Sequence, residues 1–258
     1  MRYTQGKYPI INKMSIAKGM YDMTILCKEI AEIAVPGQFV HILADGHTLR
    51  RPISIASIDK EKGTIRIVFE VRGMGTEEIA KKNVNEIIDM VGPLGGRGFN
   101  LLDKEKKVVC IGGGIGTPPM LALCEYYGKN ATMISGFRNA SIAILQKDFA
   151  DTGANAILCT DDGTAGKKGF VTEALKEYIA NEKPDMIYAC GPHPMLKAIV
   201  SIADENEIPT QVSLEERMGC GVGACLVCAC KTVRNGEEYM AHVCQDGPVF
   251  NSKEVIWQ

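Results

Sequence analysis

The chain has 258 residues, enough for two compact domains that each bury a hydrophobic core. Hydrophobic residues make up 46% of it and charged residues 23%, and 29 basic against 31 acidic side chains give a net charge of -2. The sequence therefore has neither the basic excess of a nucleic-acid-binding protein nor an acidic disordered tail. Its unusual feature is ten cysteines beside a single tryptophan.

No stretch of the sequence approaches the roughly 18 consecutive apolar residues of a membrane span. Residues 1–13 also lack the apolar core of a signal peptide. We therefore expect a cytoplasmic protein with no membrane partner. Disulfides are rare in that reducing compartment, so the cysteines are better interpreted as buried thiols together with metal ligands or catalytic thiols.

The first segment, residues 1–100, predicts a small antiparallel β-barrel. Polar and apolar side chains alternate in short runs such as 21–26 and 64–70, which is typical of half-buried strands. Turn signals such as Pro36-Gly37 and Asp45-Gly46 punctuate these runs. Within this segment only residues 75–82 predict a helix.

The second segment, residues 101–213, predicts a parallel α/β domain. The expected strands are 108–111, 132–135, 156–160, 186–190 and 210–214, and the expected helices are 118–127, 141–149, 171–181 and 194–206. Strands that alternate with helices imply right-handed crossovers and a five-stranded parallel sheet. Ligands of such sheets bind at the carboxyl ends of the strands.

The third segment, residues 214–258, is dense in glycine and cysteine and too short to build a core unaided, so we expect a metal centre to stabilise it. Cys220, Cys225 and Cys228 have the C-x4-C-x2-C spacing of plant-type [2Fe-2S] sites, and Cys244 supplies a distant fourth thiolate. The glycines between them allow backbone N–H groups to approach the cluster.

Two other interpretations of these cysteines remain. One is a structural zinc site with His242 as a ligand, although zinc sites usually have paired C-x2-C motifs and this chain has one. The other is a set of inert buried thiols. Cys230 repeats the first spacing from Cys225, and we interpret it as a core thiol.

A glycine-rich turn between a predicted strand and a predicted helix is a candidate dinucleotide site. Gly114 and Gly116 belong to a G-x-G-x-G run, but Thr117 stands where the Rossmann fingerprint has its third glycine. A simple tight turn is the alternative. Asp161 and Cys190 end later strands at the edge where ligands bind, and their alternatives are an ordinary turn acid and a buried thiol.

The barrel segment carries two weaker signals. Arg51 and Ser54 are positioned to bind a pyrophosphate, and the N–H groups of Gly75 and Thr76 begin the predicted helix and favour a second anion contact. The alternative for Arg51 is an exposed, solvated charge.

Taken together and in order, these motifs resemble the ferredoxin reductase superfamily. Within it, residues 215–225 and 246–250 are similar to the electron-transfer subunits of dihydroorotate dehydrogenase B. The resemblance implies an FAD site, a [2Fe-2S] site and an NAD site. The implied FAD site comprises Arg51, Pro52, Ile53, Ser54, Val68, Phe69, Glu70, Gly75 and Thr76. The implied [2Fe-2S] site comprises Cys220, Cys225, Cys228 and Cys244. The implied NAD site comprises Gly114, Gly116, Asp161 and Cys190. Ile53 departs from the family, because many members stack a tyrosine on the flavin there.

The resemblance also implies an activity in pyrimidine biosynthesis. Dihydroorotate would reduce FMN in a separate catalytic subunit, and electrons would pass through the cluster and FAD of this chain to NAD+. The chain itself would then be an electron relay with no catalytic residue for orotate chemistry, paired with the FMN subunit in a heterotetramer of two of each. The preference for NAD over NADP rests on the resemblance, because Arg138 lies near where a 2′-phosphate would bind.

Two rival functions remain from the sequence. One is an FAD and iron-sulfur subunit of a transhydrogenase or glutamate synthase-like complex. The other is a non-enzymatic interaction module stabilised by zinc.

Overall fold

The computed structural model describes residues 2–257, so positions 1 and 258 of the first and last predicted segments lie outside the described residues. The chain divides into two units. The first contains residues up to 98 together with 215–232 and 238–249, and the second contains 99–214, 233–237 and residues from 250 onward. The segment from 215 onward is thus shared between the two units. The predicted boundaries near residues 100 and 213 stay predictions.

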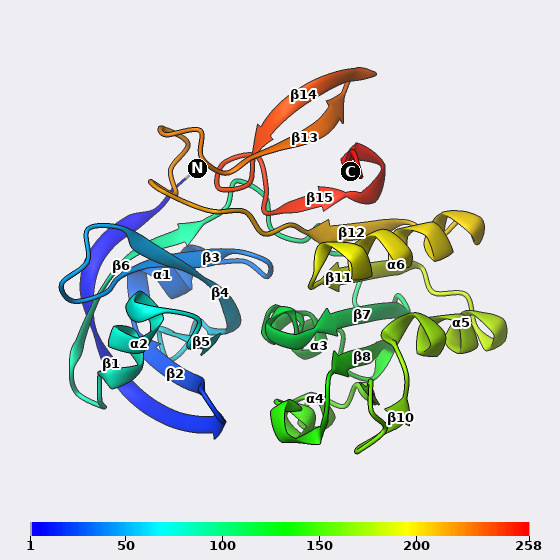
Figure 1. Ribbon diagram of the computed structural model, residues 1–258, viewed down its shortest axis with the longest axis horizontal. Helices are drawn as coiled ribbons and strands as arrows, with labels where there is room; N and C mark the ends of the chain where they lie inside the picture. The colour runs from blue at the N-terminus through cyan, green and yellow to red at the C-terminus, as the bar shows by residue number, and fades with distance from the viewer. Residues whose placement is uncertain (1, 258) are drawn as a thin grey trace. The chain divides into compact units, whose positions relative to one another are not determined.

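Six antiparallel strands of the first unit close into a barrel in the order β1-β2-β5-β4-β3-β6 (Figure 1). They are β1 (Thr4–Ala17), β2 (Met20–Leu26), β3 (Phe39–Leu43), β4 (Arg50–Asp59), β5 (Thr64–Glu70) and β6 (Ile87–Leu94). Alternation places Ile65, Ile67 and Phe69 of β5 in the barrel core. The predicted antiparallel barrel is confirmed.

Two short helices accompany the barrel strands. Helix α2 (Met74–Lys81) matches the predicted helix within one residue. Helix α1 (Lys28–Ile33) was not predicted from the sequence. Only Ile30 and Ala31 of its six residues are buried, which is too short a pattern to show a helical period.

The second unit contains a sheet of seven strands in the order β10-β9-β8-β7-β11-β12-β15 (Figure 1). They are β7 (Val108–Gly113), β8 (Ala131–Phe137), β9 (Asn155–Thr160), β10 (Lys167–Lys168), β11 (Met186–Cys190), β12 (Thr210–Ser213) and β15 (Val249–Asn251). The five predicted strands form its parallel centre, and the two additional edge strands are too short to leave a sequence pattern. A separate hairpin joins β13 (Ala229–Arg234) to β14 (Glu237–His242).

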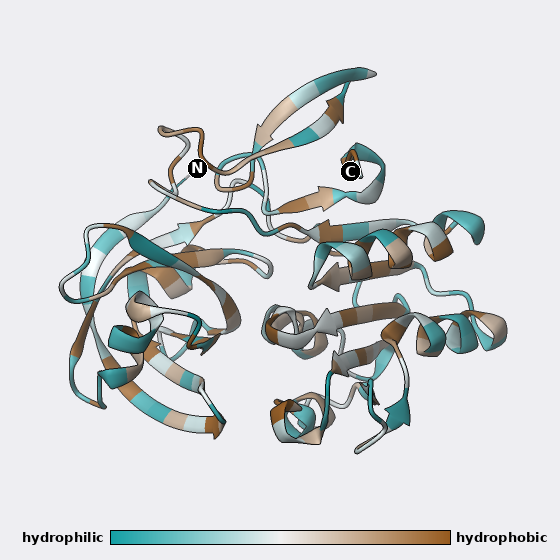
Figure 2. Ribbon diagram, viewed as in Figure 1, coloured by the Kyte–Doolittle hydropathy of each residue, from teal (hydrophilic) through white to brown (hydrophobic). Residues whose placement is uncertain are grey.

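Four α-helices belong to this sheet: α3 (Leu121–Tyr127), α4 (Gln146–Asp151), α5 (Val171–Asn181) and α6 (His193–Glu205). Helix α3 packs beside α4, and α5 packs beside α6. The sheet strands are mostly brown or white in Figure 2, which marks hydrophobic or neutral residues, as expected of strands that helices cover on both faces. Helices α5 and α6 carry many hydrophilic residues, drawn in teal. None of the helices in the described part of the chain has the length and hydropathy needed to cross a membrane.

The strand order fixes where a ligand of this sheet binds. From β7 the chain proceeds outward to β8 and β9, and it then returns to place β11 on the other side of β7. The order therefore reverses between β7 and β11. In open α/β sheets the carboxyl ends of the strands at such a reversal form the ligand crevice.

A buried ion pair links two neighbouring barrel strands. Asp22 on β2 is 1% exposed, and Arg66 on β5 donates to both of its carboxylate oxygens. The Arg66 Nη2 atom lies 2.5 Å from Asp22 Oδ2. By contrast, the pair between Lys62 and Asp59 is largely exposed.

Replacing Arg66 by Met should lower the free energy of unfolding by about 3–5 kcal/mol, because it leaves the Asp22 carboxylate buried without its partner. Urea unfolding of the purified variant measures this change. The matched variant Lys62→Met removes an exposed, solvent-screened pair and should change stability far less. Equal losses in the two variants would contradict a stabilising role for the buried pair.

Candidate functional site

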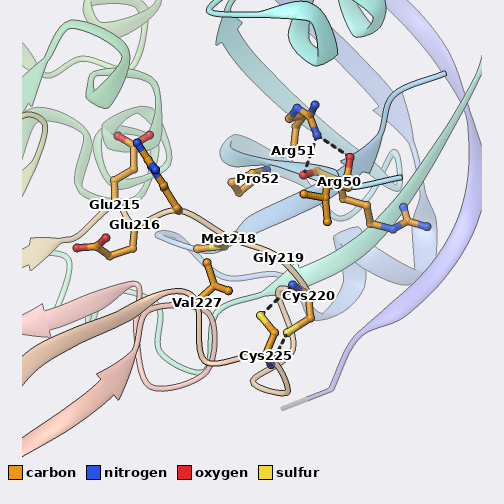
Figure 3. A pocket seen from close by; sticks show the side chains of 12 residues that line it. Arg50, Arg51, Pro52, Glu215, Glu216, Met218, Gly219, Cys220, Cys225 and Val227 are labelled. Carbon is orange, nitrogen blue, oxygen red and sulfur yellow. Dashed lines mark hydrogen bonds between the residues drawn. The ribbon is translucent and has the colours of Figure 1, made fainter. Parts of the chain in front are cut away.

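A cavity of about 1100 Å³ lies in the first unit between strand β4 and the segment that follows residue 214 (Figure 3). Its lining is Leu49, Arg50, Arg51, Pro52, Glu215, Glu216, Arg217, Met218, Gly219, Cys220, Cys225 and Val227. Figure 3 shows Arg51 and Pro52 on the barrel side, with Met218 and Cys220 on the facing segment. The cavity is large enough for a cofactor of dinucleotide size.

Arg51 and the start of helix α2 lie together, as a pyrophosphate site requires. The Arg51 Nη1 atom donates to the Leu49 carbonyl at 2.6 Å, and Nη2 lies 3.3 Å from His47 Nδ1. The guanidinium lies directly over Gly75, where a Cβ would stand 2.5 Å from Nη2. Thr76 Oγ1 accepts from the Arg72 N–H at 2.9 Å and so fixes the turn that begins α2. A guanidinium beside a helix N-terminus is suited to an anion.

The other residues predicted to hold FAD are placed differently. Pro52 is exposed and lines the cavity, whereas Ile53 is 6% exposed and packs in the barrel core. Ser54 lies opposite Phe39 in the register of β3 and β4. Val68 and Phe69 are buried, and the Glu70 carboxylate accepts from Arg72 Nε at 2.8 Å. Contacts of these side chains with the flavin stay predictions.

Backbone N–H groups converge on the sulfur of Cys220. Val222, Ala224 and Cys225 donate to it at 3.4, 3.2 and 3.4 Å, and the Cys220 N–H donates to Cys225 Sγ at 3.3 Å. Burial opposes ionisation of Cys220, but these donors outweigh it and lower the pKa of the thiol to about 7. The loop therefore directs three backbone N–H groups at the sulfur of Cys220, where they stabilise negative charge.

The other two predicted ligands form a second pair. Cys228 and Cys244 are both buried, and the Cys244 N–H donates to Cys228 Sγ at 3.5 Å. Burial and the neighbouring Cys228 sulfur raise the pKa of Cys244 to about 12. Among residues 2–257 no three metal-binding side chains are close enough to be recognised as a metal site.

The donor set nevertheless suits an iron-sulfur cluster. Four thiolates are what a [2Fe-2S] centre needs, and N–H groups directed at sulfur are its usual surroundings. Cys230, on β13, is partly buried, and burial raises the pKa of its thiol to about 11. The His242 ring lies 3.8 Å from the Asp246 carboxylate. Cys220, Cys225, Cys228 and Cys244 stay the predicted ligands of the cluster.

A fully buried histidine lies beneath the loop of residues 220–225, which we call the cluster loop. His41 on β3 is 0% exposed, and burial lowers the pKa of its ring to about 4, with the backbones of Cys220 and Arg50 opposing this shift. The backbones of Cys220 and Arg50 lie near the ring, but neither ring nitrogen makes a hydrogen bond of good geometry among the described residues. The sequence contained no signal for this site, because a lone histidine in a strand has no motif.

In the second unit, the glycine-rich turn and the strand end at Cys190 meet at the reversal between β7 and β11. Cys190 is the register partner of Gly112, and a Cβ at Gly116 would lie 2.5 Å from the Cys190 carbonyl oxygen. Gly114, with φ +54°, has open space in place of a side chain. The structure thus brings Gly114, Gly116 and Cys190 together where a dinucleotide would bind.

Asp161 occupies the same edge of the sheet but follows β9, with β8 between it and the glycine-rich turn. Its N–H donates to the Phe137 carbonyl at 3.0 Å. Thr117 is a candidate that sequence reasoning passed over. Its hydroxyl is buried without a partner in the described part of the chain, and the only signal was its place at the third glycine of the fingerprint.

Comparison with known proteins bears on both units. Residues 215–256 match the family described as the iron-sulfur cluster binding domain of dihydroorotate dehydrogenase B, and residues 110–201 match the oxidoreductase NAD-binding domain. The dihydroorotate dehydrogenase B (NAD(+)) electron transfer subunit of Desulforamulus reducens is 40% identical over 94% of this chain and 95% of its own. The subunit of the same name from a Geobacillus species is 37% identical over 98% of each chain.

The chain belongs to the family of dihydroorotate dehydrogenase B electron transfer subunits. The family resemblance predicted from the motifs is therefore confirmed. A solved chain of the NADH-dependent reduced ferredoxin-NADP oxidoreductase is also similar, with a TM-score of 0.86 and 31% identity over 97% of this chain and 90% of that one. The family match over the cysteine segment favours the dihydroorotate dehydrogenase B family over the transhydrogenase and zinc-module alternatives.

Members of this family and its structural neighbours support FAD, [2Fe-2S] and NAD as the cofactors of the fold.

If FAD occupies the cavity beside Arg51, Gly75→Ala should weaken its binding about tenfold or more, because the new Cβ displaces the guanidinium. Equilibrium dialysis of the apoprotein against FAD measures the affinity. The control Gly73→Ala adds a Cβ with nothing within 4 Å and should bind FAD normally. Unchanged affinity in Gly75→Ala would argue against this position for FAD.

The ligand assignment separates two nearby cysteines. Cys228→Ser should abolish the EPR signal of the reduced cluster, because it removes a buried sulfur from the ligand set. Cys230→Ser should keep both the signal and the iron content. The reverse pattern, with iron lost only from the Cys230 variant, would show that Cys230 is the third ligand.

Proposed function

We propose that this chain passes electrons between the FMN of a dihydroorotate-oxidising catalytic subunit and NAD+, in pyrimidine biosynthesis. The observation that carries the proposal is the shared wall of the cavity: Cys220 and Cys225 line the same space as Arg51 and Pro52. A flavin bound there would lie against two cluster ligands. No separate protein would have to bring the two groups together.

The chemistry requires both groups, since nicotinamide exchanges two electrons as a hydride, a [2Fe-2S] cluster exchanges one, and a bound flavin converts between them. The chain's own residues would supply binding and electrostatics. Arg51 and the start of α2 would neutralise the pyrophosphate, and the N–H groups around Cys220 would stabilise negative charge on its sulfur. Gly114, Gly116 and Cys190 would receive the nicotinamide nucleotide, with Asp161 farther along the same edge.

The exposed side of the cluster loop is the proposed entry for electrons. Cys225 is exposed, and Leu226 and Val227, which follow it, are 60% and 54% exposed. Exposed apolar side chains next to a cluster ligand favour contact with a protein partner. We propose that this partner is the FMN-bearing catalytic subunit, in a cytoplasmic heterotetramer of two subunits of each kind.

Co-purification with the catalytic subunit tests the proposal. The complex should reduce NAD+ when dihydroorotate is added. The isolated chain should oxidise NADH with artificial acceptors and should not act on dihydroorotate, because orotate chemistry belongs to the partner. A folded, flavin-loaded complex without dihydroorotate-dependent NAD+ reduction would contradict the proposal.

The Cys228→Ser variant of the same complex is an internal control. Without the cluster, oxidation of NADH by artificial acceptors should persist through FAD. Electron passage from dihydroorotate to NAD+ should be lost. Retention of full coupled activity without iron would show that the cluster is not on the route.

A further inference from the structure

The inference begins from the buried imidazole of His41. This side chain is fully buried, and neither ring nitrogen makes a hydrogen bond of good geometry in the described structure, although the backbones of Cys220 and Arg50 lie near the ring. Buried polar groups are nearly always paired, so a fully buried ring with no partner needs an explanation. A partner that is acquired when the site is complete would provide one.

His41 neighbours the cavity wall and contacts the cluster loop. Its strand, β3, is hydrogen-bonded to β4 and β6, and its register partner on β4 is Pro52 in the cavity wall. The imidazole ring of His41 also contacts the cluster loop. A Cβ at Gly221 would lie 2.6 Å from His41 Nδ1, and the backbone of Cys220 faces the ring as well.

The contact also restricts the loop. Gly221 has φ +74°, a left-handed conformation that other residues rarely adopt, and its missing side chain leaves the space that the ring occupies. Leu94 on β6 reaches the same point, 3.1 Å from the Cβ position, with an apolar side chain. The loop backbone therefore rests on one polar and one apolar side chain of the barrel.

We infer that His41 is a positioning residue for the iron-sulfur cluster, whose ring N–H donates a hydrogen bond to the backbone of the Cys220–Gly221 segment in the loaded protein. This inference rests on the proposed function, since it assumes that the loop holds a cluster. The hydrogen bond holds the peptide at Cys220 in place. It thereby holds the N–H groups of Val222 and Ala224 that are directed at Cys220 Sγ.

The electronic consequence follows from charge. Reduction adds negative charge to the cluster and its sulfur ligands, and N–H donors stabilise that charge. Loss of the His41 hydrogen bond loosens those donors and makes the cluster harder to reduce. The flavin site is affected less, because Arg51 and Gly75 do not depend on this ring for their contacts.

An EPR-monitored redox titration of the loaded full-length protein tests the inference. His41→Leu, which keeps the bulk and removes both nitrogens, should make reduction of the cluster about tenfold less favourable, which is about 59 mV for one electron. His41→Gln, which restores a donor, should recover most of the shift. Leu94→Val alters packing at the same point without removing a donor and should leave the midpoint unchanged. The flavin midpoint, read by absorbance, should stay constant in all three.

The outcomes separate this inference from the function on which it rests. Unmodified protein that purifies without iron and without a reduced-cluster EPR signal would overturn the proposed function. A cluster in the unmodified protein whose midpoint and EPR signal are the same in His41→Leu would overturn the role of His41 alone. An equal shift in Leu94→Val would do so as well. Should His41→Leu fail to fold, His41→Met carries the same test, because its flexible side chain adapts to irregular space.

Discussion

The close approach of the cluster loop to the barrel is the contact on which the redox site depends. Residues 215–232 have no core of their own and belong to the barrel unit. They rest on it through Gly221, whose backbone lies against His41 and Leu94. Nearby, the Arg97 N–H donates to the Gly247 carbonyl at 2.9 Å and holds the later part of the segment to the end of the barrel. The four predicted cluster ligands and the flavin motif are therefore parts of one unit.

This arrangement explains why the two kinds of anion-binding chemistry differ. The Arg51 guanidinium, lying over Gly75, supplies a fixed positive charge suited to a pyrophosphate. Around Cys220 the stabilisation comes from backbone N–H groups that donate to the sulfur. They stabilise added negative charge on the sulfur without a full counter-ion. The cavity thus offers different partners to the pyrophosphate that we propose beside Arg51 and to the sulfur of Cys220.

Much of the fold was predictable because its periods are long and regular. The alternation in β5 predicted a barrel strand, and the apolar runs of β7, β8 and β11 predicted a parallel sheet. Edge strands β10 and β15 and helix α1 left no detectable pattern, because each is too short for a period to appear. Spacing alone selected the four cysteines, since chelation restricts the sequence directly.

Contacts between distant residues set the limit of sequence reasoning. The motifs assigned Arg51 and Gly75 to one anion site, but they did not show that the guanidinium lies directly on Gly75. Nothing in the sequence indicates that His41 lies under Gly221, because the fold brings these residues together. Ile53 shows a related limit: its motif did not indicate that the side chain is buried in the barrel core, and its contact with the flavin stays a prediction. Motifs identify the chemistry, and only the fold shows which side of the strand carries it.

Anaerobic addition of NADH to the isolated chain, loaded with FAD and cluster, tests the central claim most directly. Visible absorbance follows the flavin and EPR follows the cluster. If both groups share the cavity, the account predicts that NADH bleaches the flavin and that the reduced-cluster EPR signal appears with it, without any partner subunit. A flavin that bleaches while the cluster stays oxidised until a chemical reductant is added would contradict the shared site.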